Sequence, residues 1–516
     1  MSITIQRALL SVYDKNDLLP FATFLHQRGI EIVSTGGTAL LLKKHNIPVI
    51  EIEDFTQHPE IMEGRVKTLH PKIHGGILGR RDKDVAIMEQ CGISDIDLIV
   101  VNLYPFEKVI QEPTCTLEHA IENIDIGGPA LIRAAAKNHA WVTVVVDPKD
   151  YVLIMQQLEQ ENSIAEHVRF RMAKKAFHTT AKYDGCIANY LSKLDDEYHP
   201  KAFGDYCHIP LEFDRSLRYG ENPHQIAALY REITPNQTTL SHAEFLHGKG
   251  LSHNNILDAE TAITCCYQFE NPTCVIVKHA NPCGVAESTT LLSAYEKAFL
   301  CDPQSAFGGI LAFNRAVDKD LLAKIFSQQF VEVVIAPEFT RDALHFAKLK
   351  PNTLLIMTGT TKLDFSHLLP DFKKIRGAVL LQGWDNIPFD PSACSIVTKK
   401  SPTATQWEDL IFAWKVVKFV KSNAIVLAHD RHTIGIGAGQ TSRVSSVEIA
   451  RDKTKISTVK TDKAVLASDA FFPFKDGVEL AANIPITAII QPGGSIRDQE
   501  VIDTCDQLGL AMVFTH

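Results

Sequence analysis

A glycine-rich turn near the start of the chain has the residue types of a phosphate site. Residues 34–38 read Ser-Thr-Gly-Gly-Thr, between a short apolar segment and a segment with helical spacing. Glycines let the backbone approach a ligand closely, and a helix N-terminus offers free N–H groups, to which Ser34 and Thr35 add hydroxyls. The spacing fits neither a Walker A loop nor a dinucleotide loop. Taken alone, the turn is better explained as an ordinary strand–helix connection with a Ser/Thr cap.

A cluster of basic residues follows at 63–76, where the sequence is Glu-Gly-Arg-Val-Lys-Thr-Leu-His-Pro-Lys-Ile-His-Gly-Gly. His70 and His74 have the spacing of a helical zinc pair, but the proline and the paired glycines between and after them argue against a continuous helix. Arg65 and Lys67 suit an anion instead. Without the neighbouring glycine-rich turn, a solvated basic loop is about as good an explanation.

Three residues further along could move a proton or stabilise an oxyanion. Tyr104 follows the apolar run 96–103, Asp125 lies in an Asn-Ile-Asp-Ile-Gly-Gly-Pro turn, and Lys137 lies in the helical segment after that turn. Sites in open parallel sheets usually lie at strand ends, which favours a role for Tyr104. Each residue also has an ordinary interpretation, as a strand-end tyrosine, a turn aspartate or a surface lysine.

The second half of the chain has a candidate pair, Lys278-His279, directly after the apolar run 274–277. A neighbouring lysine charge disfavours protonation of an imidazole and can stabilise an oxyanion, which leaves the histidine as a usable base. As a dipeptide alone, the pair is more typical of a lysine facing water and a histidine hydrogen-bonded in a turn. A G-x-G-x-G run at 435–439 lacks the spacing and the acidic partner of a dinucleotide loop.

The elements that must position these residues follow from the hydrophobic spacing. In the first half of the chain, we predict strands at 7–13, 31–34, 96–103 and 141–146, and helices at 15–28, 38–45 and 164–194. This alternation indicates a parallel sheet covered by helices on both faces. The periodicity breaks at 195–204, and beyond it we predict strands at 274–277 and 333–335 and a helix at 407–422. No fixed-period repeat is visible, and the second half is predicted to be mixed α/β with more than one lobe.

The composition excludes several classes of protein. The 516 residues are 45% hydrophobic and carry a net charge of −9, which fits several globular cores and argues against nucleic-acid and membrane-surface binding. The 11 cysteines form no Cys-x-x-Cys motif, as expected for reduced thiols. The first residues do not read as a signal peptide, and the apolar runs are strand-length. We therefore expect a cytoplasmic protein.

Motifs spread over residues 1–195 resemble the inosinate (IMP) cyclohydrolase domain of bifunctional purine biosynthesis enzymes, which has a methylglyoxal-synthase-like fold. They are Leu-Ser-Val-Tyr-Asp-Lys at 10–15, the glycine-rich turn, the basic run 64–76 and Ala-Ala-Ala-Lys-Asn-His at 134–139. The resemblance implies Lys67, Tyr104, Asp125 and Lys137 as catalytic residues. It also implies a nucleotide-binding set of Ser11, Lys15, Ser34, Thr35, Gly36, Gly37, Arg65, Thr68, Asn102, Gly127 and Gly128.

Further stretches in residues 211–516 resemble the formyltransferase domain of the same enzymes, with 196–210 as the linker. These stretches lie at 217–225, 254–255, 302–309, 421–423, 435–443 and 468–474. The family's fold here is a pair of cytidine-deaminase-like lobes joined by a helical segment. The deaminase zinc signature is missing, because Pro282-Cys283 is followed by Gly-Val-Ala. The resemblance implies Lys278 and His279 as the catalytic pair, and a substrate-binding set of Arg218, Tyr219, Asn255, Gly308, Asn423 and Arg443.

The resemblance implies the last two steps of de novo purine biosynthesis. A formyl group passes from 10-formyltetrahydrofolate to aminoimidazole carboxamide ribotide (AICAR), and the formylated product (FAICAR) then closes to IMP with loss of water. The closure gains from proximity, so lysine, tyrosine and backbone N–H groups suffice without a transition metal. The family also implies a homodimer with the transferase site at its interface, and a bound monovalent cation is compatible with it. Its members usually continue with a short basic, aromatic tail, whereas this sequence ends at His516.

Two other hypotheses remain open at this point. One is a chain with cyclohydrolase activity alone, and the other is a metabolite-binding regulatory protein built on a phosphate-binding domain. A regulatory protein has no need for Tyr104, Asp125 and Lys137 together with a Lys-His pair, which makes this the weaker hypothesis.

Overall fold

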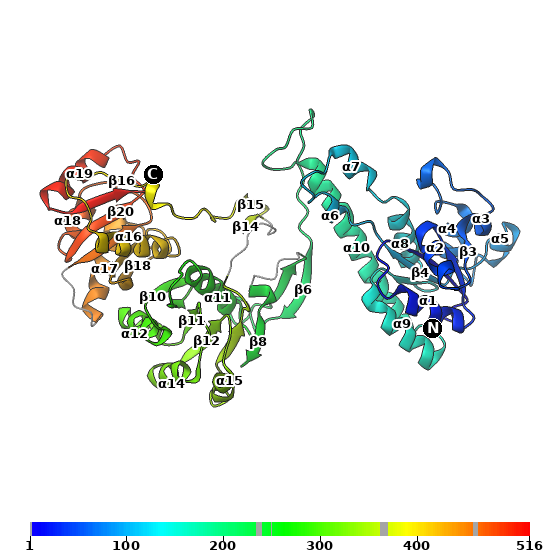
Figure 1. Cartoon of the computed structure of the whole chain (residues 1–516), viewed down its shortest axis with the longest axis horizontal. Helices are drawn as coiled ribbons and strands as arrows, with labels where there is room; N and C mark the ends of the chain where they lie inside the picture. The colour runs from blue at the N-terminus through cyan, green and yellow to red at the C-terminus, as the bar shows by residue number, and fades with distance from the viewer. Residues whose placement is uncertain (1–2, 234–239, 249, 362–369, 458–462) are drawn as a thin grey trace. The chain divides into compact units, whose positions relative to one another are not determined.

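The computed structural model describes residues 3–233, 240–248, 250–361, 370–457 and 463–516. The chain divides into two compact units, Met1–Pro210 and Leu211–His516, coloured blue to teal and green to red in Figure 1. Each unit has its own sheet and its own hydrophobic core. Within the described residues, no helix combines the length and the apolar character needed to cross a membrane.

Unit 1 contains a five-stranded sheet in the order β3-β2-β1-β4-β5, and every neighbouring pair is parallel. The strands are β1 (Arg7–Val12), β2 (Glu31–Ser34), β3 (Ile50–Glu51), β4 (Leu98–Asn102) and β5 (Thr143–Val145). The predicted parallel sheet is therefore confirmed. The chain moves from β1 outward to β3 and then returns to the other side of β1 with β4. This reversal creates a switch point between β1 and β4, where open α/β sheets usually bind ligands.

Helices cover both faces of this sheet. Those of unit 1 are α1 (Leu18–Gln27), α2 (Gly36–Lys44), α3 (Ile52–Thr56), α4 (Pro71–Leu78), α5 (Val85–Gln90), α6 (Phe106–Val109), α7 (Leu117–Glu122), α8 (Gly127–Lys137), α9 (Tyr151–Glu161) and α10 (Glu166–Ser192). The crossover through α1 moves from β1 to β2, toward one end of the strand order, and the crossover through α8 moves from β4 to β5, toward the other end. Because such crossovers are right-handed, α1 and α8 lie on opposite faces of the sheet. Helix α1 contacts α9, whereas α8 contacts α4 and the long helix α10.

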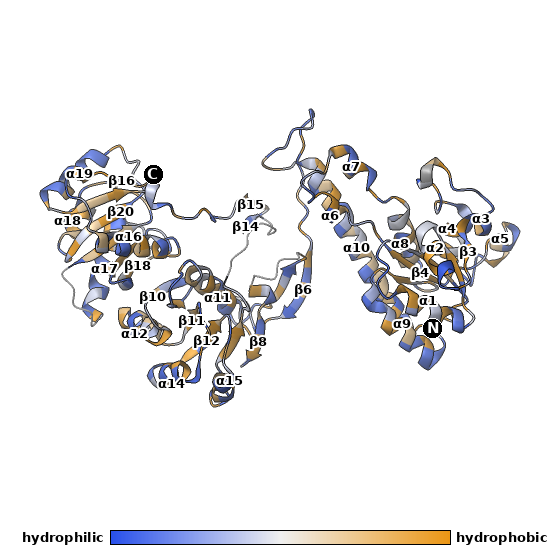
Figure 2. Cartoon of the chain, in the orientation of Figure 1, coloured by the Kyte–Doolittle hydropathy of each residue, from blue (hydrophilic) through white to orange (hydrophobic). Residues whose placement is uncertain are grey.

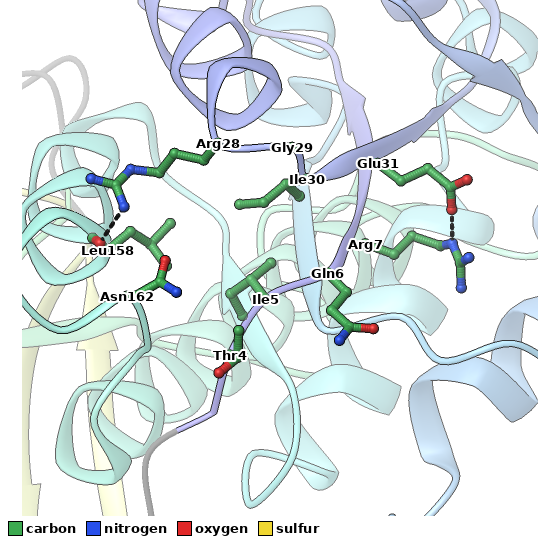
Figure 3. Close-up of a pocket in the computed structure, with 10 residues that line it drawn as sticks. All are labelled: Thr4, Ile5, Gln6, Arg7, Arg28, Gly29, Ile30, Glu31, Leu158 and Asn162. Atoms are coloured by element: carbon green, nitrogen blue, oxygen red, sulfur yellow. Dashed lines mark hydrogen bonds and ion pairs between the residues drawn. The ribbon is translucent and has the colours of Figure 1, made fainter.

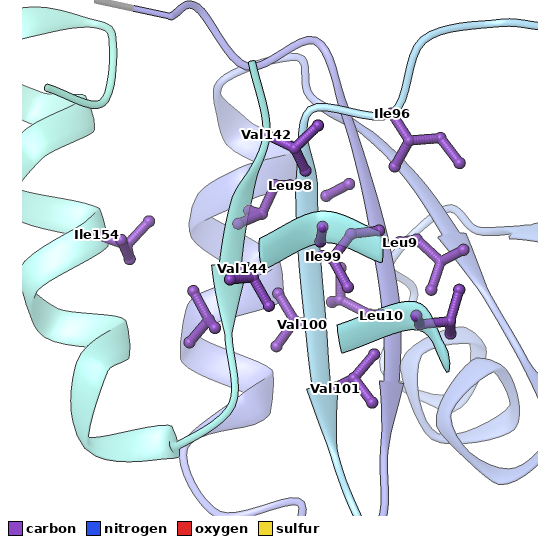
Figure 4. Close-up of a cluster of buried hydrophobic side chains, with 14 of the residues drawn as sticks. Leu9, Leu10, Ile96, Leu98, Ile99, Val100, Val101, Val142, Val144 and Ile154 are labelled. Carbon is purple, nitrogen blue, oxygen red and sulfur yellow. The ribbon is translucent and has the colours of Figure 1, made fainter. Parts of the chain in front are cut away.

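The core of unit 1 lies between the sheet and its two helical layers. Leu98 to Val101 of β4 are all buried, so this central strand has no solvent-facing side, as its continuous apolar run predicts. Figure 4 shows these residues beside Leu9 and Leu10 of β1, with Ile154 of α9 approaching from the neighbouring layer. The hydropathy colouring in Figure 2 shows the same pattern, with apolar strands inside and polar helix surfaces outside.

Unit 2 contains a 12-stranded mixed sheet in the order β16-β21-β20-β19-β17-β18-β10-β9-β11-β12-β13-β8, with two separate ribbons, β6–β7 and β14–β15. Its strands are β6 (Leu211–Ser216), β7 (Ala228–Glu232), β8 (Glu244–His247), β9 (Thr273–Lys278), β10 (Asn281–Glu287), β11 (Gly309–Phe313), β12 (Val331–Ala336), β13 (Leu354–Met357), β14 (Asp371–Ile375), β15 (Ala378–Gln382), β16 (Ser395–Ile396), β17 (Ile425–His429), β18 (His432–Gly437), β19 (Ala464–Ser468), β20 (Ile486–Gln491) and β21 (Ala511–Phe514). The mixed α/β prediction is confirmed for this half.

The helices of unit 2 reveal that its fold contains the same arrangement twice. They are α11 (His253–Cys266), α12 (Leu291–Cys301), α13 (Pro303–Ala306), α14 (Lys319–Gln328), α15 (Arg341–Ala347), α16 (Ala404–Val417), α17 (Arg443–Ile456), α18 (Asp476–Ala481) and α19 (Asp498–Gln507). In each half, a helix precedes an antiparallel hairpin, which three further helix–strand units follow, and the sheet orders β10-β9-β11-β12-β13 and β18-β17-β19-β20-β21 correspond. We call residues 253–357 lobe 1 and residues 404–514 lobe 2. The structural repeat was not visible as a sequence repeat.

Candidate functional site

A cavity of about 660 Å³ opens at the carboxyl ends of β1, β2 and β4, at the switch point of unit 1. Its lining includes most of the predicted site residues of this unit, namely Ser11, Lys15, Thr35, Gly36, Gly37, Arg65, Lys67, Thr68, Asn102, Tyr104, Asp125, Gly127 and Gly128. The segments that carry them are far apart in sequence, and the parallel sheet brings them to one edge. We call this cavity the unit 1 pocket.

The glycine-rich turn forms one wall of the unit 1 pocket. Helix α2 begins at Gly36 after Thr35, whose side chain does not cap the helix. The Thr35 hydroxyl instead lies 2.8 Å from the Ser11 hydroxyl, across from β2 to β1. Gly36 has a φ of 41°, which favours glycine at this position. Ser34 lies outside the lining: its buried hydroxyl donates to the carbonyl of Leu10 at 2.7 Å, so it holds the two strands together.

Lys67 brings positive charge to the same wall. A Cβ atom built on Gly36 would lie 3.9 Å from the Lys67 ammonium nitrogen, and one built on Gly64 would lie 3.7 Å from it. The lysine side chain therefore reaches both glycine turns. Arg65 is exposed at the rim and forms an ion pair with Glu122. The helix N-terminus, the hydroxyls and the ammonium together suit a phosphate group.

Asp125 and the start of α8 form the opposite wall. The Gly128 N–H donates to the Asp125 carboxylate at 2.8 Å, so this carboxylate binds an N–H group of the first turn, while Ile126 is the N-cap residue. Burial raises the pKa of Asp125, and the N–H groups of Gly128, Tyr104 and Gly127 and the charge of Lys67 oppose that rise. The backbone N–H of Asp125 donates to the Tyr183 hydroxyl of α10 at 2.7 Å.

Tyr183 is a supporting residue that the sequence analysis missed. Its hydroxyl donates to the Asn123 carbonyl at 3.3 Å while accepting the Asp125 N–H, so it holds the turn before α8 on both sides. Burial raises the pKa of Tyr183 to about 12, which keeps the hydroxyl protonated. The only sequence signal is an aromatic position on the buried stripe of a long helix, and this signal does not distinguish a packing tyrosine from a hydrogen-bonding one.

The end of β4 positions Tyr104 through Asn102. The Asn102 side chain accepts the N–H groups of Tyr13 and Asp14 at 2.7 and 2.8 Å and donates to the Asp14 carbonyl at 3.0 Å. This ties the turn after β1 to the end of β4. Tyr104 is 47% exposed and lines the pocket, and its ring lies 5.3 Å from the Tyr13 ring.

Two features of unit 1 differ from what the sequence pattern alone indicates. Lys137 is exposed and ends helix α8, ten residues after Gly127, which places it roughly 15 Å along the helix axis from the pocket wall. The structure therefore does not bring Lys137 to the unit 1 pocket of the same chain. The second difference concerns the basic run, where α4 is helical from Pro71 and His70 is its N-cap. Proline suits the first helical position, so it starts this helix instead of preventing it.

A second cavity in unit 1, of about 480 Å³, lies at the opposite edge of the same sheet (Figure 3). Its charged groups already have protein partners: Arg28 donates to the Leu158 carbonyl at 2.7 Å, and Arg7 pairs with Glu31. It lies at the amino ends of β1 and β2, away from the strand ends where ligands bind in such sheets. The unit 1 pocket is therefore the candidate functional site of this unit.

In unit 2, Lys278 and His279 lie where β9 turns into β10. The Lys278 ammonium donates to the Phe307 carbonyl at 2.7 Å, next to Gly308, while the side chain of His279 is exposed in the single chain. The N–H groups of His279 and Ala280 donate to the carboxylate of Asp258 on α11, at 3.2 and 2.6 Å. Burial raises the pKa of Asp258, and these two N–H groups oppose the rise.

The other predicted residues of lobe 1 gather at the start of α11. Arg218 donates to the Asn255 side chain at 3.3 Å and lies over the ring of Tyr219 at 5.4 Å. The Asn255 amide in turn donates to Glu332 at 2.8 Å. Asn255 and Asp258 are three residues apart on one helix, so this group and the Lys278-His279 turn lie along the same helix face.

Asn423 and Arg443 form a third group, in lobe 2. The buried Arg443 guanidinium donates to Asn423 at 2.9 Å and to Asp469 at 2.6 Å. A hydrogen bond links this region to the strand that follows the Lys278-His279 turn, because the Lys421 N–H donates to the Asn281 side chain at 2.9 Å. Among the residues that the structure describes, no group of three or more His, Cys, Asp or Glu side chains could hold a metal ion.

Comparison with known proteins gives two family matches. A family model described as "AICARFT/IMPCHase bienzyme" matches residues 135–453, and one described as "MGS-like domain" matches residues 17–130. A solved structure described as "Crystal structure of ForH" matches this chain with 34% sequence identity. The match covers 36% of this chain and 98% of the chain in that structure, and the two superpose with a TM-score of 0.32. A superposition this weak carries no argument about the fold.

Proposed function

The chain belongs to the AICARFT/IMPCHase bienzyme family, which performs the last two steps of IMP biosynthesis, and we propose that it does so at two separate sites, one in each unit. Ring closure is assigned to the unit 1 pocket and formyl transfer to the Lys278-His279 turn of unit 2. The domain boundaries of this proposal are 1–195 for the cyclohydrolase, 196–210 for the linker and 211–516 for the transferase. The observation that carries the ring-closure assignment is a pocket in unit 1 that brings together two helix N-termini, Lys67 and Asp125.

In the unit 1 pocket, the glycine-rich turn binds the phosphate of the nucleotide. The residues at the start of α2 line the cavity and the Thr35 side chain does not cap the helix, so its first N–H groups are available to an anion. The hydroxyls of Ser11 and Thr35 add donors, and Lys15 and Arg65 add charge at the rim. Asn102, Thr68, Gly127 and Gly128 line the remainder of the nucleotide site.

Ring closure joins the carboxamide nitrogen of FAICAR to its own formyl carbon. The carboxamide nitrogen loses a proton as the new bond forms, and the formyl oxygen becomes an alkoxide. The oxygen then takes up two protons, equivalent to one lost from each nitrogen on this carbon, and leaves as water while a C=N bond forms to the former formamide nitrogen. Asp125 accepts the carboxamide proton, and the Lys67 ammonium stabilises the alkoxide with help from the Tyr104 hydroxyl. Lys67 takes the role that the sequence also offered to Lys137, because Lys67 lines the pocket and Lys137 ends α8 far from it.

Formyl transfer in unit 2 begins when the AICAR amine attacks the formyl carbon of the folate. This amine is a weak nucleophile because its lone pair is delocalised into the ring. His279 accepts its proton, and Lys278 stabilises the oxyanion that collapses to release the folate nitrogen, which takes up a proton. Arg218, Tyr219, Asn255, Gly308, Asn423 and Arg443 position the nucleotide in this proposal.

The folate is a co-substrate, as the family assignment requires. We further propose a cytoplasmic homodimer with nucleotide and folate as its small-molecule partners. The β14–β15 ribbon supports the homodimer, because its apolar side chains Phe372, Ile375, Val379 and Leu380 are 41 to 56% exposed in the single chain. The two lobes of unit 2 correspond to the cytidine-deaminase-like pair in this proposal, and the repeated element order supports that. A bound monovalent cation rests on the family resemblance alone.

Two single variants test the two-site proposal by crossed effects. His279→Ala is expected to abolish the production of IMP from AICAR and 10-formyltetrahydrofolate while leaving the closure of supplied FAICAR unchanged. Lys67→Ala is expected to abolish the closure of FAICAR while leaving formyl transfer intact. Both activities are measured on the full chain, with FAICAR and IMP separated by chromatography. Loss of both activities in either folded variant would contradict the assignment of two separate sites.

A further inference from the structure

The structural repeat places two similar hairpin turns in unit 2. In lobe 1, His279 and Ala280 connect β9 to β10 with φ values of 53° and 54°. In lobe 2, Asp430 and Arg431 connect β17 to β18 with φ values of 47° and 52°. Both are two-residue turns with two left-handed positions, the geometry of a type I′ hairpin.

Neither turn has the glycine that this geometry favours at its second position, where Ala280 and Arg431 stand. Type I′ turns usually contain Asn-Gly, Asp-Gly or Gly-Gly, because most other side chains resist a positive φ. Three of the four residues are histidine, alanine and arginine, so other contacts must hold the backbone in place.

A carboxylate from the preceding helix holds each turn in the same way. Asp258 of α11 accepts the N–H groups of His279 and Ala280 at 3.2 and 2.6 Å. Asp409 of α16 accepts the N–H groups of Asp430 and Arg431 at 3.1 and 2.7 Å. The two aspartates occupy equivalent positions in the repeat, on the helix that precedes the hairpin.

Only the lobe 1 turn carries the catalytic pair, and its backbone is held from a second direction. The Asn281 side chain donates to the His279 carbonyl at 3.1 Å, so both peptide groups of His279 have fixed partners. The His279 ring itself is exposed and remains free to meet a substrate. Because the ring projects from the turn, a change in the φ of His279 moves the ring as a whole.

We propose that Asp258 is a positioning residue for formyl transfer, which acts by holding His279 and Ala280 in the left-handed turn that aims the imidazole at the AICAR amine. This inference rests on the proposed role of His279. Asp258 does not exchange a proton with the substrate in this proposal, and it acts through the backbone of the turn. A carboxylate suits the role because its oxygens can each accept one N–H group, whereas an amide has only one acceptor oxygen.

The test compares Asp258→Asn with its counterpart in the repeat, Asp409→Asn, in the full chain. Each change replaces one carboxylate oxygen by an NH₂ group that faces a backbone N–H, so both are expected to lower the unfolding temperature of unit 2 to a similar degree. Asp258→Asn is expected to lower kcat for formyl transfer on the order of 10- to 100-fold, because small displacements of a reacting group have effects of this size. The KM for AICAR is expected to change much less, and closure of supplied FAICAR to stay unchanged. Asp409→Asn is expected to retain kcat.

The outcomes separate this inference from the assignment of the catalytic pair. Equal values of kcat in the two Asn variants, whether both low or both normal, would overturn the positioning role of Asp258. Normal formyl transfer by His279→Ala would instead overturn the proposed catalytic role of His279. If Asp258→Asn does not fold, the comparison is repeated with Ala280→Gly added to it and Arg431→Gly added to Asp409→Asn, since glycine adopts a positive φ without strain. The same difference in kcat is expected there, and its absence overturns the inference.

Discussion

Gly128→Ala tests the geometry of the unit 1 pocket with one added carbon atom. Gly128 is the second residue of α8, and its N–H binds the Asp125 carboxylate. A Cβ at this position would lie 2.5 Å from Asp125 Oδ2 and 2.7 Å from the Leu103 side chain. Ordinary contacts between such atoms are near 3.5 Å, so the carboxylate must withdraw by roughly 1 Å.

This displacement has two measurable consequences. The overpacked contact and the weakened hydrogen bond are expected to lower the free energy of unfolding of unit 1 by about 1–3 kcal/mol, even though alanine is the better helix former. The closure of supplied FAICAR is expected to slow on the order of 100-fold, since a misplacement of 1 Å can have this effect on a reacting group. Formyl transfer in unit 2 should be unchanged, which shows that the chain is otherwise intact.

Gly37→Ala is the matched control for stability. Gly37 is the second residue of α2, as Gly128 is of α8, but a Cβ there meets no atom within 4 Å. Chemical denaturation should therefore show that this variant is as stable as the parent protein, or more stable by up to about 1 kcal/mol. If Gly128→Ala closes FAICAR at the parental rate, the position of Asp125 does not control the reaction and the proposed role of this residue is wrong.

Three further variants test other contacts. Tyr183→Phe removes the hydroxyl that accepts the Asp125 N–H, so denaturation should show unit 1 less stable by about 1–2 kcal/mol and FAICAR closure should slow; unchanged stability and rate would remove Tyr183 from the site. Arg443→Met leaves the Asp469 carboxylate without the guanidinium 2.6 Å away, and the free energy of unfolding of unit 2 should fall by about 3–5 kcal/mol in urea, because a partly buried charge loses its partner; a change under about 1 kcal/mol would contradict this. Burial lowers the pKa of His432 from 6.5 to about 4, so the unfolded chain binds this proton first and unit 2 should lose stability as the pH falls from about 6.5 to about 4. His432→Asn should reduce that pH dependence, measured by urea midpoints at several pH values, and an unchanged slope would exclude His432 as its source.

The sheet of unit 1 could be predicted because its strands are buried on both faces. A continuous apolar run such as 98–101 has no other stable location in a soluble α/β fold, and alternation with amphipathic helices then requires parallel strands. The edge of the sheet that carries the unit 1 pocket follows from the same logic, because the glycine-rich turn and Tyr104 both come after strands. The strands of this sheet could be predicted because the burial of a continuous apolar run is a local property of the sequence.

The parts that could not be predicted depend on contacts between distant segments. Ser34 has the residue type of a phosphate ligand, but its hydroxyl bonds to the neighbouring strand. Lys137 lies at the C-terminal end of α8, whereas the unit 1 pocket lies at the N-terminal end of this helix, and the residue at which α8 begins could not be read from the sequence. The repeat in unit 2 could not be seen in the sequence, because the two lobes share their element order and not their residues. The equivalent turns, for example, read Lys278-His279-Ala280 in lobe 1 and His429-Asp430-Arg431 in lobe 2.

Both proposed sites use an aspartate to hold the backbone beside the reactive side chains. Asp125 binds the N–H of Gly128 at the start of α8, and Asp258 binds the N–H groups of His279 and Ala280. A backbone N–H cannot move independently of its peptide plane, so these bonds restrain the main chain while the reactive side chains stay accessible. In unit 2 this arrangement lets the exposed His279 ring react from a fixed position, which preserves the advantage of proximity without burying the imidazole. It also explains why Asp258→Asn, which keeps the shape and removes one acceptor, is the smallest substitution that separates positioning from packing in unit 2. In unit 1 the same change at Asp125 would also remove the proposed proton acceptor.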